Sequence, residues 1–149
     1  MKKKTFYIIL LGAVVSSMIA FLFPLSFSNL IENCDSIKII YINDNLQHSP
    51  INEKIFEKDS ETFSELKNIF EDYSYRRCVR TIFDGSSMSG NDAGYWLHIY
   101  IDNGNERTVI ILGGTGEMQI EDKIYRMGYW GNESMLGFME EIVEVAFTD

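Results

Sequence analysis

An uninterrupted apolar stretch, residues 6–23, contains no charged side chain and dominates the start of the chain. Three lysines precede it at residues 2–4, and Pro24, which cannot continue a helix, follows it. A helix of this length rises roughly 27 Å, slightly less than the roughly 30 Å hydrocarbon core of a bilayer. The stretch therefore predicts either an uncleaved membrane anchor or a signal peptide, and we assign it to residues 1–28.

Two features bear on the choice between anchor and signal peptide. The triplet of residues 26–28, Ser-Phe-Ser, resembles the small-residue site of signal peptidase, so secretion after cleavage near Ser28 is the alternative. The apolar run is longer than the roughly 7–15 residues of a typical signal-peptide core, which favours a retained anchor. Because the next basic residue after the run is Lys38, the positive-inside rule predicts a cytoplasmic N-terminus and a domain outside the cell membrane.

The remaining chain is predicted to be a short tether, residues 29–36, and one domain, residues 37–149. Without the lysines of residues 2–4, the chain has ten basic and 22 acidic side chains, which gives a formal charge of −12. This charge weighs against nucleic acid as a partner. It also supports an alternative function, an immunity or inhibitor-type protein that neutralises a basic secreted partner.

The patterns of apolar residues predict an α+β fold. One amphipathic helix begins at Ser60 or Thr62. A second runs from Asn132 to about Ala146, with Leu136, Met139, Val143 and Ala146 on its buried stripe. Strands are predicted at residues 37–42, 75–83, 95–102, 106–112, 118–120 and 123–127, with a further extended piece near residues 51–56. Tight turns at Asn103-Gly104 and at Glu121-Asp122 predict two hairpins among them. We expect an antiparallel sheet of about five to six strands with both helices on one face.

The most suggestive surface lies on the strand predicted at residues 95–102. Leu97, Ile99 and Ile101 point to one side of this strand, while Trp96, His98 and Tyr100 point to the other. On the strand predicted at residues 75–83, Arg76 and Arg80 share one face. Aromatic residues combined with arginine are typical of binding hot spots, so these five residues form the candidate partner-binding surface. The alternative is that they are ordinary cross-strand pairs that shield an exposed sheet.

No pattern of catalytic, metal-binding or cofactor-binding residues stands out, and we expect no cofactor. A small hydrolase built on His98 is an alternative, because the predicted loop before its strand is rich in serine and aspartate. Its candidate partners are Asp84, Ser86, Ser87, Ser89, Asp92 and Asp102. His48 and His98 have no ligand partner at metal-binding spacing. Cys34 and Cys78 could form a disulfide in an oxidising exterior, and the alternative is two free thiols.

Residues 95–104 and 120–125 resemble the hairpin segments of small uncharacterised exported domains of Gram-positive bacteria. This resemblance implies a location in the bacterial envelope and implies no activity. We therefore expect a membrane-tethered extracytoplasmic binding domain, whose partner is another envelope protein, a peptide or a glycan.

Overall fold

The computed structural model describes residues 3–43, 52–82, 95–113, 116–128 and 132–148. Its elements in chain order are α1 (Lys3–Leu22), β1 (Leu25–Ser26), α2 (Ser28–Ile31), β2 (Ser36–Asn43), β3 (Asn52–Glu57), α3 (Glu61–Asp72), β4 (Ser74–Arg77), α4 (Val79–Ile82), β5 (Tyr95–Asp102), β6 (Arg107–Gly113), β7 (Glu117–Ile120), β8 (Lys123–Met127) and α5 (Asn132–Phe147).

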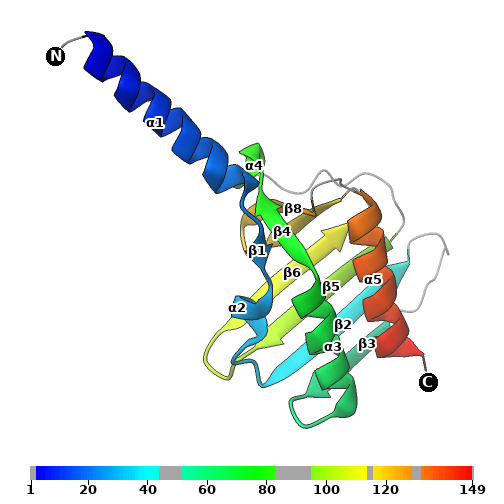
Figure 1. Cartoon of the computed structure of the whole chain (residues 1–149). Helices are drawn as coiled ribbons and strands as arrows, with labels where there is room; N and C mark the ends of the chain where they lie inside the picture. Colours follow the sequence, from blue (N-terminus) through cyan, green and yellow to red (C-terminus); the bar gives the residue numbers. More distant parts are fainter. Residues whose placement is uncertain (1–2, 44–51, 83–94, 114–115, 129–131, 149) are drawn as a thin grey trace.

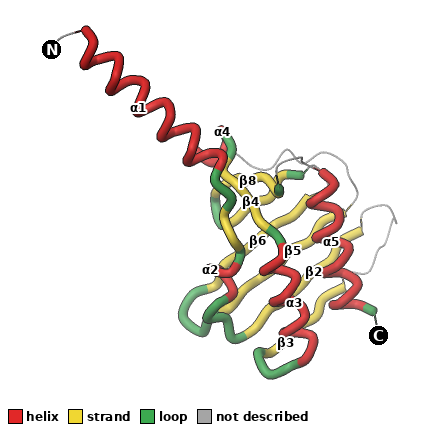
Figure 2. Tube along the Cα trace, in the orientation of Figure 1, coloured by secondary structure: helices red, strands yellow, loops and turns green. Residues whose placement is uncertain are grey.

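The described strands form one antiparallel sheet in the order β1-β4-β8-β7-β6-β5-β2-β3 (Figure 2). Helices α3 and α5 lie side by side across one face of this sheet (Figure 1). The predicted α+β class and antiparallel sheet are confirmed, although the sheet has eight strands rather than five or six. The main core lies between the sheet and these two helices.

Helix α3 begins where its capping residue predicts. The Ser60 hydroxyl accepts a hydrogen bond from the backbone N–H of Phe63 at 3.2 Å, which satisfies one of the free donors of the first turn. Ser60, rather than Thr62, is thus the N-cap. The apolar positions of the helix recur at helical spacing, and Phe63, Leu66 and Phe70 are buried against the sheet.

Helix α5 buries the predicted stripe except at Leu136: Met139 and Ala146 are buried, and Val143 packs partly buried against the core. Its buried side chains are Met135, Phe138, Met139, Ile142 and Ala146, whereas Leu136 is 42% exposed. The prediction for Leu136 is wrong because the stripe is centred on Phe138, which is in ring contact with Phe27, Phe70 and Tyr73.

A hydrogen bond joins α5 to the end of α3. The Tyr73 hydroxyl donates to Glu141 Oε1 at 2.7 Å, and burial together with this bond raises the pKa of Tyr73 to about 12. The phenol therefore keeps its proton across the physiological range and continues to link the two helices.

The hairpin predicted at Asn103-Gly104 is present between β5 and β6. Asn103 Oδ1 accepts from the backbone N–H groups of Asn105 and Glu106, and Gly104 has a φ of 80°, a conformation that favours glycine. Asp102 also pairs with Arg107 at 2.8 Å, and this contact lowers the pKa of the Asp102 carboxyl. The hairpin thus fixes the register that places Trp96, His98 and Tyr100 on one face.

Folded structure begins before residue 37 and includes the end of the predicted leader, residues 25–28, as well as residues of the predicted tether, 29–36. Strand β1 pairs with β4, and α2 follows directly. Phe27, Ile31 and Cys34 lie in the main core, with Phe27 completely buried. The physical reason is that the core needs these side chains to close the space between α3, α5 and the edge of the sheet.

The strand predicted at residues 75–83 ends early. Strand β4 stops at Arg77, and the short helix α4 begins at Val79. The turn is fixed by Thr81, whose hydroxyl accepts from the Cys78 backbone N–H at 2.8 Å and donates to the Ile124 carbonyl. Cys78 and Arg80 therefore do not lie on a strand, and the prediction for this segment is wrong beyond Arg77.

Helix α1 projects away from the sheet (Figure 1) and contacts the rest of the chain where its C-terminal end meets β4. Its large apolar side chains between Phe6 and Ile19 are 47% to 71% exposed. Since residues 6–11 are consecutive, these exposed side chains surround the helix on all sides. In the described part of the chain, no helix combines the length and the apolar character that crossing a membrane requires.

Both cysteines are free thiols in this structure. The Cys34 thiol is buried and donates to the Ile31 carbonyl at 3.1 Å, and its burial raises its pKa. The Cys78 thiol lies near the Ile124 carbonyl at 3.6 Å. The disulfide considered from the sequence is therefore not formed here.

Candidate functional site

The face of the sheet opposite α3 and α5 carries the predicted aromatic residues. On β5, Leu97, Ile99 and Ile101 are buried, while Trp96, His98 and Tyr100 are half-buried on the other side. The register places His98 between Ile40 of β2 and Ile111 of β6, and Tyr100 beside Val109. We call this surface the open-face patch and define it by Ile40, Trp96, His98, Tyr100, Val109 and Ile111.

Charged side chains border the open-face patch. Lys38 Nζ lies 5.7 Å from the centre of the Tyr100 ring and 2.6 Å from Glu53 Oε1. The contact of Lys38 with the ring is a cation–π interaction that holds Tyr100 in place. The patch thus has an apolar and aromatic centre with a charged rim, an arrangement typical of protein interfaces.

Burial of His98 lowers its pKa below the usual value near 6.5. Because the unfolded chain then binds more protons than the folded one between the two pKa values, stability rises with pH through this window and is lost on acidification below about pH 6.5. We expect the wild type to lose more unfolding free energy between pH 7.5 and pH 5 than His98→Asn, as measured by urea titrations. Identical losses in both proteins would contradict this environment for His98.

The two predicted arginines lie away from the aromatic residues. Trp96 of β5 pairs with Gly113 of β6. Strand β7 lies next to β6, and on its other side Arg126 of β8 pairs with Arg76 of β4. Four strand spacings of about 4.8 Å separate Trp96 from Arg76, which is about 19 Å. The five predicted residues therefore do not form one site.

Arg76 and Arg80 instead belong to a second site, a cavity of about 350 Å³ next to α4. We call it the arginine pocket; its lining residues are Phe21, Arg76, Arg77, Cys78, Arg80, Glu117 and Arg126. At its centre, Glu117 is nearly buried, with Oε2 2.5 Å from Arg80 Nη1 and Oε1 3.8 Å from Arg126 Nη2. A single carboxylate thus orients two guanidinium groups.

The sequence did not reveal Arg77, Arg126 or Glu117 as members of this pocket. Glu117 and Arg126 face each other across β7 and β8, and Arg126 faces Arg76 across β8 and β4. The sequence signal that could have revealed Glu117 and Arg126 is their opposite charge at paired positions of one hairpin. The hairpin itself was predicted, so the pair Glu117 and Arg126 could have been found from its register.

The hydrolase alternative rests mainly on residues outside the described part of the chain. Asp84, Ser86, Ser87, Ser89 and Asp92 all fall there. Asp102 lies four residues along β5 from His98, about 13 Å away, and pairs with Arg107. Asp102 is therefore too distant to orient the His98 ring.

Among the described residues, no three or more His, Cys, Asp or Glu side chains lie together in a group that could hold a metal ion. His48 lies outside the described residues.

The fold and the two surfaces define an α+β domain with an eight-stranded antiparallel sheet, helices on one face and a projecting apolar helix. Comparisons with protein-family models, with curated proteins and with solved structures find no match.

Proposed function

We propose that this chain is a membrane-tethered, non-enzymatic binding domain of the cell envelope, which holds a protein or peptide partner on the open-face patch. The observation that carries the proposal is the composition of this patch. Trp96, His98 and Tyr100 lie beside aliphatic side chains on a sheet face that α3 and α5 do not cover. Aromatic residues surrounded by aliphatic ones supply most of the energy at protein interfaces.

The surface of α1 supports the membrane tether. Exposed apolar side chains on every side of a helix are costly in water, at roughly 25 cal/mol per Å² of apolar surface. The proposed insertion into lipid would remove this cost, although the described helix does not by itself meet the length and apolar character of a membrane crossing. Lys3 and Lys4 at the start of α1, and the absence of basic residues in the sequence from its end to Lys38, favour an orientation with the domain outside the cell membrane.

The position of Phe27 supports a leader that is retained. Cleavage near Ser28 would remove β1 and Phe27 from the domain, although Phe27 is completely buried among aromatic rings. A secreted form starting at Asn29 would therefore lack part of its own core.

Site-specific photo-crosslinking tests the partner-binding surface. A photoreactive amino acid at Tyr100 is expected to give a discrete crosslinked product in cells, and Trp96→Ala is expected to reduce its yield about tenfold, which corresponds to about 1.4 kcal/mol of binding energy. The same probe at Glu144, which is exposed on α5, should give no such product.

Leu136→Ala is the matched control for Trp96→Ala, because Leu136 is an exposed apolar side chain on the opposite side of the sheet. It should leave the yield unchanged. An equal yield from wild type and Trp96→Ala, or the same product from position 144, would refute the open-face patch as the binding surface.

A further inference from the structure

The arginine pocket concentrates basic side chains in an otherwise acidic protein. The chain carries a formal net charge of −9 and has five arginines, of which four, Arg76, Arg77, Arg80 and Arg126, line this cavity. Its lining includes one carboxylate, Glu117. Among the described lining residues, four guanidinium groups and one carboxylate give a local excess of positive charge, which favours an anion. Guanidinium groups bind phosphate oxygens through paired hydrogen bonds, so a phosphate group fits this chemistry.

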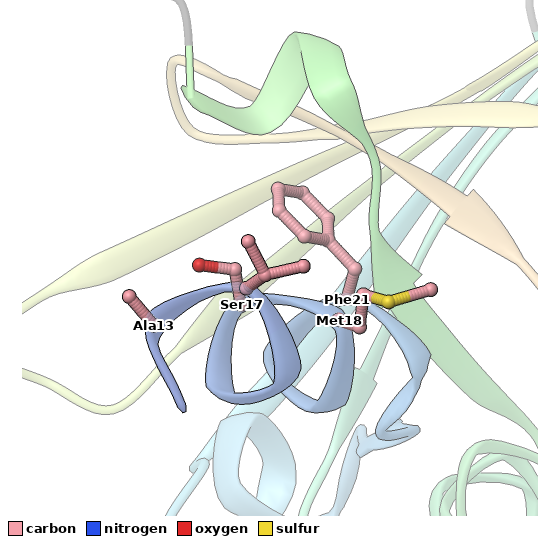
Figure 3. A pocket seen from close by; sticks show the side chains of 5 residues that line it. Ala13, Ser17, Met18 and Phe21 are labelled. Atoms are coloured by element: carbon pink, nitrogen blue, oxygen red, sulfur yellow. The ribbon is translucent and has the colours of Figure 1, made fainter. Parts of the chain in front are cut away.

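The pocket lies where α1 joins the domain. Phe21, in the last turns of α1, lines the arginine pocket. The same side chain also lines a shallow, open groove of about 440 Å³ on the surface of α1, whose lining residues are Ala13, Val14, Ser17, Met18 and Phe21. Figure 3 shows Phe21 projecting from α1 at one end of the lining residues, with Ala13 at the other end and Ser17 between them along the helix.

The two cavities differ in chemistry and share one residue. The groove is lined by apolar and small side chains, which leave room for an alkyl chain beside the helix. The arginine pocket offers positive charge beyond the end of that groove. An apolar groove that leads to a cationic pocket matches a molecule with an acyl chain and a phosphate.

We propose that the groove and the arginine pocket together bind one anionic phospholipid, with an acyl chain along α1 and the headgroup phosphate among the arginines. This inference rests on the proposed insertion of α1 into lipid. The site fixes the domain against the membrane surface, because the phosphate contacts β4, α4 and β8 while the acyl chain contacts α1.

The test uses the full chain purified in detergent and transferred to mixed micelles of phosphatidylcholine and phosphatidylglycerol, with native mass spectrometry as the readout. We expect the wild type to retain one phosphatidylglycerol. The variant Arg77→Gln/Arg126→Gln should retain it at least about tenfold more weakly, because two cations near a headgroup are lost. Both side chains are exposed, so the variant should keep its fold.

The matched control is Lys58→Gln/Arg107→Gln, which changes the net charge equally. Arg107 lies six residues along β6 from Gly113, about 20 Å from the strand end near Glu117. This control should retain the lipid within about twofold of wild type. Equal loss in both double variants would overturn the site, because it would show attraction to the charge of the whole protein.

Two further arms test the pocket and the groove separately. Arg77→Lys/Arg126→Lys keeps the charge but removes the planar donor geometry, and it should retain less lipid than wild type. Ser17→Leu fills the groove and should also weaken retention, whereas Ser16→Leu, outside the groove lining, should not. Wild-type retention by the Lys variant or by Ser17→Leu would overturn the proposed geometry.

Inorganic phosphate distinguishes a lipid from a free anion. If 10 mM inorganic phosphate displaces the lipid while an equal ionic strength of chloride does not, and Ser17→Leu has no effect, the pocket is a site for a soluble phosphate and the lipid proposal fails. Flotation with phosphatidylcholine vesicles tests the tether independently. A chain that does not float refutes the membrane insertion. A chain that floats but retains no phosphatidylglycerol in the mixed-micelle experiment refutes only the lipid site.

Discussion

Phe27→Ala is expected to lower the free energy of unfolding by about 3–5 kcal/mol, the usual cost of removing a fully buried phenylalanine. The Phe27 ring lies 4.7 Å from the Tyr75 ring, 5.3 Å from Phe138 and 5.5 Å from Phe70, measured between ring centres. Its removal leaves a cavity between elements from three distant parts of the chain. Urea titration of the full chain in detergent, followed by near-ultraviolet circular dichroism, measures the change.

Leu136→Ala is the control for this experiment, because Leu136 is 42% exposed on α5 and makes no comparable core contact. Its effect should stay within about 0.5 kcal/mol. If Phe27→Ala costs no more than Leu136→Ala, the segment from Leu25 to Ile31 does not belong to the core.

Glu117→Ala is expected to cost about 3 kcal/mol, because it removes the carboxylate that two arginines face. The Glu117 side chain is 11% exposed and the Arg80 side chain 31% exposed, so the guanidinium left behind is only partly hydrated. Most of the loss should come from this uncompensated charge rather than from lost attraction. The same denaturant titration measures it.

The double variant Glu117→Ala/Arg80→Met separates these two causes. Removing the charge that has lost its partner should recover part of the stability, so the double variant should be more stable than Glu117→Ala alone. A double variant that is less stable by the sum of both single changes would show that Glu117 and Arg80 contribute independently.

Local patterns predicted most of the regular elements. Alternation along residues 95–102 correctly separated Leu97 and Ile99 from His98 and Tyr100, because a strand with one covered face must alternate. The Ser60 cap located the start of α3, since an N-cap works through contacts within four residues. Predictions of this kind succeed where the residues that decide the structure lie close together in the sequence.

The remaining features depend on contacts between distant residues. Strand β1 has only two residues, and its existence depends on β4, about fifty positions later. The end of β4 at Arg77 depends on the hydrogen bond from Thr81 to the Ile124 carbonyl. The arginine pocket likewise needs Phe21, Arg80 and Arg126 to meet. No local pattern contains such information.

The N-terminus of the protein in its producing cells tests most directly whether the leader, which continues into β1 and the buried Phe27, is retained. Peptide mass spectrometry of the chain recovered from membranes should detect a peptide that crosses the bond between Ser28 and Asn29. A folded, soluble protein that begins at Asn29, with no peptide crossing that bond, would contradict both the core position of Phe27 and the retained tether.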